Sequence, residues 1–545
     1  MMSTVEKNPV IKTRSGKGRG SQARGVVDES DMTARVKEIL NRWPTVGLAV
    51  GVVCDGRLVF FHGHGLADIE SRTAVTEDTV FRIASLTKTF TAIAVMQLWE
   101  RGLVDLDAPA NDYLRAYQLI PARASFRPAT VRHLLTHTAG IPEVVYASDL
   151  LHPGWGPFGA RPAIHSVKIG EPMPSLAEYY RGGLPVVVEP GTVFAYTNHG
   201  FATLGQIVED VSGEPLDRYL REHIFGPLGM ADSDLVRSER VMRLLATGYD
   251  LGPSGAKAVT DREWIGRGGG GIYSSSRDMA RYVAALLGGG ANEHGRVLQP
   301  ETLATMFAPH YQPDPRLTGI GLGFFCHDAG GHLVVSHEGI LPGFNSELFV
   351  APDDSLGLFA FTNGSSGATA WLPIELGRLL HHLLDVPDEV VRSDIPQHPE
   401  IWDEICGRYR LPQRVSDLRG RVMMGGGAQV FVRGGRLMLR VRTPLPALYG
   451  GLPLYPDSDA DPYVFRLDLS KFGMATVRLV FGHEARVGTK AIHTDLGSQP
   501  VSLYKRPTAS LTRLWATSAL GALTAAAAVT AVRRLRRRPH KEMVR

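Results

Sequence analysis

The sequence is poor in cysteine, and this scarcity excludes several kinds of site. Its three cysteines, Cys54, Cys326 and Cys406, are far apart, and none lies in a C-x-x-C pair or a Cys/His cluster. This spacing argues against a disulfide framework and against a structural zinc site. His62 and His64 are close together, but with no third ligand nearby they indicate the end of a strand. We therefore expect no metal and no cofactor.

The chain also lacks a strong net charge. Its 59 Lys and Arg residues nearly balance 55 Asp and Glu residues, and much of the excess of +4 lies at the two ends. This balance gives no indication of a nucleic-acid-binding surface, so no nucleic-acid partner is expected. Residues 1–31 carry scattered basic residues among Gly, Ser and Thr, which predicts a disordered basic tail. No apolar run follows this tail, so we expect no N-terminal secretory signal.

The most informative stretch runs from Phe81 to Gly102. From Leu86 onward it is rich in helix-compatible apolar residues, contains no proline, and ends in Arg-Gly. This pattern predicts a mostly buried helix of about four turns. Ser85 and Lys88 would then lie on one face of its first turn, with Cβ atoms about 5–6 Å apart.

A serine and a lysine at this spacing can form a nucleophile and its base. The serine hydroxyl needs a base, and a lysine can serve only if burial lowers its pKa from the ~10.4 of a free lysine. The helix N-terminus adds N–H groups that favour the negative charge of a reacting oxygen. Alone, S-x-x-K is a weak signal, because a chain of this length contains about one by chance.

A second candidate motif is Tyr196-x-Asn198, which follows a Pro-Gly turn and precedes a helix expected at residues 201–211. A phenol can relay a proton, and an amide can bind a carbonyl group. Taken singly, each residue has a commoner structural explanation, a buried tyrosine and a helix-capping asparagine.

A third candidate is the alternating strand 333–340, which ends in His337-x-Gly339. A glycine here would let a substrate lie close to the strand, with the N–H of Ile340 pointing at it. Other patterns predict a hairpin at residues 46–61 around an Asp-Gly turn, short helices at 130–135 and near 175–181, a glycine run at 268–271 leading into a helix, and strands at 346–350 and 356–362.

Together, the three motifs resemble those of the serine β-lactamase and penicillin-binding-protein superfamily, in the class C-like branch that includes D-peptidases and esterases. S-x-x-K, Y-x-N and H-x-G occur in the family's order, the last where β-lactamases carry K-T-G. The phrases Phe81–Ala84, Leu134–Gly140 and Gly268–Tyr273 also look like the family. The resemblance covers roughly residues 32–385.

The resemblance implies an α/β (α+β) sandwich of the β-lactamase/transpeptidase type. Its antiparallel sheet would combine the N-terminal hairpin with the strands after residue 332 and would be flanked by helices, with a helical insert between.

The same resemblance implies roles for individual residues. Ser85 would attack a carbonyl and become acylated, while Lys88 and Tyr196 would share the proton and later activate water. The N–H groups of Ser85 and Ile340 would form an oxyanion hole. The implied catalytic residues are Ser85, Lys88 and Tyr196, and the implied substrate-binding residues are Asn198, His337, Gly339 and Ile340.

The departure from K-T-G bears on the substrate. A lysine suits the carboxylate of penicillins, whereas His337 is only partly charged near neutral pH and Glu338 adds a negative charge beside it. We therefore favour an esterase or a D-amino-acid amidase or peptidase acting on a small-molecule ester, amide or peptide. The alternatives are a β-lactamase or D,D-carboxypeptidase, and a non-catalytic scaffold, which would have no need of Lys88 or Tyr196. The oligomeric state cannot be read from the sequence.

A chain of 545 residues is too long for one compact core. Short alternating runs separated by Gly and Asp turns predict a C-terminal antiparallel β domain. The expected order is a basic tail at 1–31, the catalytic domain at 32–386, a linker at 387–400, the β-rich accessory domain at 401–508, a transmembrane helix at 514–532 and a basic tail at 533–545.

Residues 514–532 carry no charge and are followed by a cluster of arginines, which predicts a single C-terminal membrane span with the basic cluster in the cytoplasm. The segment is rich in alanine and threonine, so a helix lying on a surface or in solution is the alternative. Without the span, the protein would be cytoplasmic.

Overall fold

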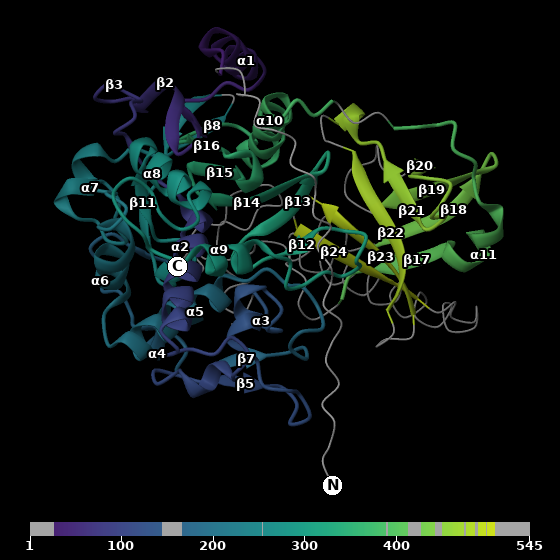
Figure 1. Cartoon of the computed structure of the whole chain (residues 1–545), viewed down its shortest axis with the longest axis horizontal. Helices are drawn as coiled ribbons and strands as arrows, with labels where there is room; N and C mark the ends of the chain where they lie inside the picture. The colour runs from purple at the N-terminus through teal and green to yellow at the C-terminus, as the bar shows by residue number, and fades with distance from the viewer. Residues whose placement is uncertain are drawn as a thin grey trace, which may run out of the picture.

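The computed structural model describes residues 27–143, 166–252, 254–387, 391–412, 427–441, 450–472, 476–484, 489–496 and 499–506. Residues 27–387, with the gaps just given, form an α/β body, and the remaining described residues are dominated by a β-barrel (Figure 1).

The α/β body is built on an eight-stranded antiparallel sheet. Its strands, in spatial order, are β12 (Gly319–Ile320), β13 (Phe325–Ala329), β14 (His332–Leu341), β15 (Phe344–Ala351), β16 (Leu356–Thr362), β1 (Gly47–Cys54), β2 (Arg57–Asp68) and β3 (Thr73–Ala74). The predicted hairpin and its pairing with later strands are confirmed. Two details differ: β12 and β13 begin the sheet before residue 332, and β2 continues past His62 and His64, which therefore do not mark a strand end.

Helices cover both faces of this sheet. Helices α1 (Glu29–Arg42) and α10 (Ala368–Leu383) lie on one face and α8 (Ser276–Leu287) on the other, with α2 (Thr87–Glu100) packed in the same buried cluster as α8 (Figure 1). Strand β1 serves both layers because its side chains alternate. Leu48, Val50 and Val52 join the α1/α10 cluster, and Ala49 and Val53 join the α2/α8 cluster.

A helical insert lies between the N-terminal hairpin and the later strands, as the resemblance implied. It contains α3 (Val131–Leu135), α4 (Leu176–Tyr179), α5 (Asn198–Ser212), α6 (Leu216–Leu220) and α7 (Glu239–Leu244), with α9 (Pro300–Phe307) after α8. Short strand pairs tie it together: β4 (Val80–Arg82) with β11 (Tyr273–Ser275), β5 (Leu119–Pro121) with β7 (Leu184–Val186), β6 (Ser166–Lys168) with β10 (Arg262–Trp264), and β8 (Tyr249–Gly252) with β9 (Gly255–Ala258).

Two predicted boundaries near the motifs are wrong. Helix α5 begins at Asn198 rather than near residue 201, because the Thr197 side chain accepts a hydrogen bond from the His199 N–H and caps it there. Asn198 therefore lies in the first helical turn. Strand β14 continues to Leu341, so His337 and Gly339 lie inside the strand and not at its end.

The C-terminal strands close into an eight-stranded antiparallel barrel. Its strands are β17 (Gly407–Arg410), β18 (Ala428–Arg433), β19 (Arg436–Val441), β20 (Leu452–Pro456), β21 (Val464–Leu467), β22 (Val477–Glu484), β23 (Thr489–Leu496) and β24 (Gln499–Lys505), and a short helix α11 (Trp402–Ile405) precedes them. Tyr409 on β17 pairs with Lys505 on β24 to close the ring. Closure removes the exposed strand edges that an open sheet would have.

The barrel meets the α/β body at β12, which lies close to β24 (Figure 1). Arg316 forms an ion pair with Asp461, with Nη1 and Oδ2 3.1 Å apart. The hydroxyl of Thr318 donates to Asp495 over 3.0 Å. A third hydrogen bond, from Gln499, reaches strand β14.

None of the helices in the described ranges is both long and apolar enough to cross a membrane. The predicted span at 514–532 lies outside the described residues, so it stays a prediction.

Candidate active site

Ser85 lies in a tight turn directly before helix α2. The turn is the 3₁₀ helix η1 (Ala84–Leu86), and its first residue, Ala84, has a φ of +51°. A left-handed conformation costs an L-residue about 1–2 kcal/mol, so the surroundings must hold this turn in place. The Ser346 hydroxyl on β15 does so by donating to the Ile83 carbonyl over 2.8 Å.

The amine of Lys88 contacts three groups of the site. It is 0% exposed, and its Nζ lies 2.9 Å from Ser85 Oγ, 2.7 Å from Asn198 Oδ1 and 2.5 Å from the carbonyl oxygen of Gly269. Burial lowers the pKa of Lys88 to about 7, although the negative charges of Glu143 and Glu338 act in the opposite direction. A large fraction of Lys88 is therefore neutral near pH 7.

Two of these partners take the hydrogens of a neutral amine. Gly269 ends the 3₁₀ helix η5 (Arg267–Gly269), within the predicted glycine run. Its carbonyl and the Asn198 side-chain oxygen can only accept hydrogen bonds from Lys88. The nitrogen lone pair is then left for the third neighbour, the Ser85 hydroxyl, which is the arrangement a general base requires.

Asn198 is itself fixed by a buried carboxylate that the sequence did not single out. Glu143 accepts hydrogen bonds from the backbone N–H and the side-chain Nδ2 of Asn198, both over 2.8 Å. Because the side-chain nitrogen is bound to Glu143, the side-chain oxygen is directed at Lys88.

Tyr196 lies against a second residue that was not singled out, His137. The two rings are stacked with centroids 4.3 Å apart, and the Lys88 ammonium nitrogen lies 4.9 Å from the Tyr196 ring centroid. His137 is buried and has a φ of +55°, and its Nδ1 accepts a hydrogen bond from the Thr197 N–H. Burial, Lys88 and His337 together lower the pKa of His137, so its ring is neutral.

The H-x-G strand forms another wall. His337 is buried, and burial, followed by the charge of Lys88, lowers its pKa to about 3. It is therefore neutral, not partly charged as the sequence suggested. Its ring centroid lies 6.4 Å from that of Tyr196.

The packing around Gly339 leaves no room for a side chain. A Cβ added there would lie 2.0 Å from Ser346 Oγ and 2.4 Å from the Ile83 carbonyl oxygen. The space beside Gly339 is thus filled by the nucleophile turn, and the glycine lets β14 pack against that turn. Ile340 follows it on β14, in register with Asn345 on β15.

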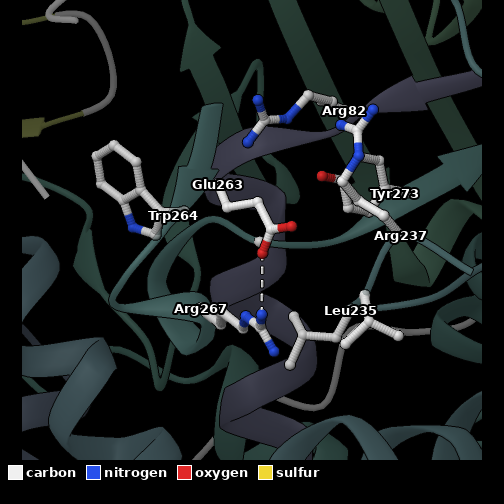
Figure 2. A pocket seen from close by; sticks show the side chains of 9 residues that line it. Arg82, Leu235, Arg237, Glu263, Trp264, Arg267 and Tyr273 are labelled. Atoms are coloured by element: carbon white, nitrogen blue, oxygen red, sulfur yellow. Dashed lines mark hydrogen bonds and ion pairs between the residues drawn. The ribbon is translucent and has the colours of Figure 1, made fainter. Parts of the chain in front are cut away.

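A pocket lined by Arg82, Arg237, Arg267 and Tyr273, among others, lies next to these elements, and its lining does not include Ser85, Lys88 or Tyr196. Arg267 pairs with Glu263 in the lining of this pocket (Figure 2). Arg82 and Arg237, which also line it, both pair with Asp261. Arg82 ends β4, directly before the nucleophile turn. These ion pairs therefore tie down β4, which precedes the nucleophile turn, and η5, which carries Gly269.

One group of three ligand-type side chains lies close enough together to share a metal ion within the described ranges: Glu214, Glu222 and His223. Arg218 lies 2.9 Å from Glu222 and 4.0 Å from Glu214. Arg218 offsets one of the two negative charges of this cluster, which includes none of the site residues.

The structure brings Ser85, Lys88 and Asn198 into direct contact, with Tyr196 and His337 around them. Of the two residues that the sequence reading missed, His137 lies in the phrase Leu134–Gly140, which did look like the family. Glu143 carried no signal, since it is a single acid after a proline.

Comparison with known proteins identifies the family. Residues 33–379 match the Beta-lactamase family model. The chain belongs to the Beta-lactamase family. It is 30% identical over 349 residues to a D-aminopeptidase from Brucella anthropi, an alignment that covers 63% of this chain and 61% of that protein. A D-aminopeptidase from Gluconobacter oxydans is 27% identical over 66% of this chain and 63% of its own length.

The chain thus spans less than two thirds of the length of these two D-aminopeptidases. Among solved structures, the octameric penicillin-binding protein homologue from Pyrococcus abyssi has a TM-score of 0.55 and 24% identity, over 88% of this chain and all of that one. This likeness concerns the fold. Because it covers 88% of the chain, it extends beyond the part that matches the Beta-lactamase family model.

Proposed function

We propose that this Beta-lactamase family protein is a serine hydrolase that forms an acyl-enzyme on Ser85. The observation that carries the proposal is the environment of Lys88, a buried amine 2.9 Å from the Ser85 hydroxyl with a pKa of about 7. An amine in this state can take the serine proton at neutral pH, which activates the nucleophile.

In the proposed reaction, Ser85 Oγ bonds to the substrate carbonyl carbon as its proton passes to Lys88 Nζ. Backbone N–H groups of Ser85 and Ile340 stabilise the negative oxygen of the tetrahedral intermediate. Tyr196, beside Lys88, relays the proton to the leaving nitrogen or oxygen, and the carbonyl–heteroatom bond breaks. Water then attacks the acyl-enzyme by the same route, which releases the acid and restores Ser85.

We propose a D-amino-acid amide or a short peptide with a free amino group as the substrate. Two carboxylates, Glu143 and Glu338, act on Lys88, and His337 is neutral. The surroundings of the site are therefore negative, which favours a substrate that carries an ammonium group and disfavours the carboxylate of a penicillin. The D-aminopeptidases among the relatives support this class. Esters of the same acyl groups require the same chemistry.

The test is intact-mass labelling with a fluorophosphonate, together with turnover of D- and L-alanine p-nitroanilide, their N-acetylated forms, an aryl acetate and benzylpenicillin. We expect an adduct in wild type and in Ser71→Ala, an exposed-serine control, and none in Ser85→Ala. We expect the free-amine D-substrate to be preferred. No adduct on folded protein would refute the acyl-enzyme, and equal turnover of the N-acetylated forms would refute the substrate class.

A further inference from the structure

A side chain of the barrel reaches the strand that walls the active site. Gln499 is the first residue of β24, and its Nε2 donates a hydrogen bond to Glu338 Oε1 over 3.1 Å. Glu338 lies on β14 between His337 and Gly339. The barrel thus contacts the H-x-G segment itself as well as the region around β12.

Glu338 also faces a second carboxyl group. Its partner across the β14–β15 pair is Glu347, whose side chain is 2% exposed. Two carboxylates in such positions repel each other, so one of them holds a proton. Burial, and then the charge of Glu338, raise the pKa of Glu347 well above its ordinary value. Glu347 is therefore the protonated member, and the negative charge resides on Glu338.

The Gln499 amide favours this distribution of charge. An N–H donor stabilises the ionised form of the carboxyl group that accepts from it. The charge on Glu338 in turn acts on Lys88, where it opposes the effect of burial. Besides Ser85 and the Gly269 carbonyl, the described groups around Lys88 include the carboxylate of Glu143, the neutral rings of His137 and His337, the phenol of Tyr196, and Asn198.

We propose that Gln499 is a positioning residue: its amide holds the Glu338 carboxylate in place on β14, the strand that walls the active site, so that the barrel takes part in setting the reactivity of the Ser85–Lys88 pair. The inference rests on the proposed function, because the effect is catalytic only if Lys88 activates Ser85. Without the Gln499 donor, the proton held by Glu347 is shared more evenly with Glu338, so Glu338 carries less negative charge. The ammonium form of Lys88 is then stabilised less.

The test uses the full-length chain and the rate of fluorophosphonate labelling of Ser85 as a function of pH. The labelling rate should rise with pH as Lys88 loses its proton. We expect the midpoint of this rise to move to a lower pH by about one unit in Glu338→Gln, which removes the charge. In Gln499→Met, which keeps side-chain length but lacks the donor, the shift should be about half a unit. The double variant should match Glu338→Gln, since Gln499 acts through Glu338.

The matched control is Asp461→Asn, which weakens another barrel contact, the ion pair with Arg316, without touching β14. We expect it to leave the midpoint in place. Thermal unfolding of each variant confirms that the barrel is folded, and Glu338→Gln probes the same charge without a change in the barrel.

Three results would overturn the proposal. The first is a Gln499→Met profile identical to wild type while Glu338→Gln shifts. The second is an equal shift in Asp461→Asn, which would assign the effect to docking in general. The third is additive shifts in the double variant. If wild-type Ser85 takes no label at all, the proposed function itself fails and this inference falls with it.

Discussion

The ring of Tyr196 lies against the ring of His137, with the ring planes 29° from parallel. This contact fixes the aromatic ring of Tyr196 without using its hydroxyl, so the two contributions of the side chain can be separated by mutation.

Tyr196→Phe keeps the stacked ring and removes the phenol oxygen. We expect kcat for an amide substrate to fall by about 10²–10⁴, the usual contribution of a general acid or base, with little change in Tm. Tyr113→Phe is the control, because the Tyr113 hydroxyl accepts a hydrogen bond from the backbone N–H of Asp105, outside the site. A drop in kcat no larger than in this control would exclude a proton-relay role.

The rate of Ser85 labelling should rise with pH through about 7. The pKa of Lys88 is lowered to about 7, so the ammonium form predominates below this value and the reactive neutral amine above it. With an unperturbed lysine, the labelling rate would rise instead at pH ~10.4. Lys88→Arg, which stays protonated, should abolish labelling, and Lys37→Arg on the exposed side of α1 should not. A rise in the labelling rate with its midpoint above pH 9 would contradict the role of Lys88 as the base.

Gly339→Ala should destabilise the fold. The new methyl group would overlap the Ser346 hydroxyl and the Ile83 carbonyl, and overpacking of this kind costs about 1–3 kcal/mol. Urea unfolding measures the loss. Gly377→Ala in α10 is the matched control, because a Cβ there meets nothing within 4 Å and alanine favours a helix. Equal stability of the Gly339 variant and wild type would show that β14 and the nucleophile turn are not tightly packed.

Asp261→Asn should also lower the free energy of unfolding, by about 1–3 kcal/mol. The substitution leaves two largely buried guanidinium groups, those of Arg82 and Arg237, without their shared carboxylate. Asp78→Asn, which breaks an exposed pair with Arg277, should change stability by no more than about 1 kcal/mol. Similar effects of the two substitutions would argue against a bracing role for Asp261.

The sequence predicted those parts of the site that depend on local spacing. Ser85 and Lys88 are three residues apart at a helix start, and this spacing predicted that they would lie near each other. The Asp55-Gly56 turn likewise predicted the β1–β2 hairpin, where both residues adopt positive φ.

Contacts between distant segments could not be predicted in the same way. Glu143 meets Asn198, and Gln499 meets Glu338, only because the fold brings them together. The charge state of His337 depends on burial, which a single strand pattern does not reveal. The packing of Gly339 depends on the position of the nucleophile turn, so the sequence identified the residue but not this contact.

The pairing of β1 with β16 has a consequence for synthesis of the chain. Leu48 lies opposite Thr362, so the first strand of the sheet must wait for a partner made roughly 300 residues later. At about 5–20 residues per second, translation leaves the apolar hairpin with an open edge for on the order of 15–60 s. Non-local pairing of this kind also slows folding itself. During that interval, the nascent hairpin is the segment that a chaperone must shield from aggregation.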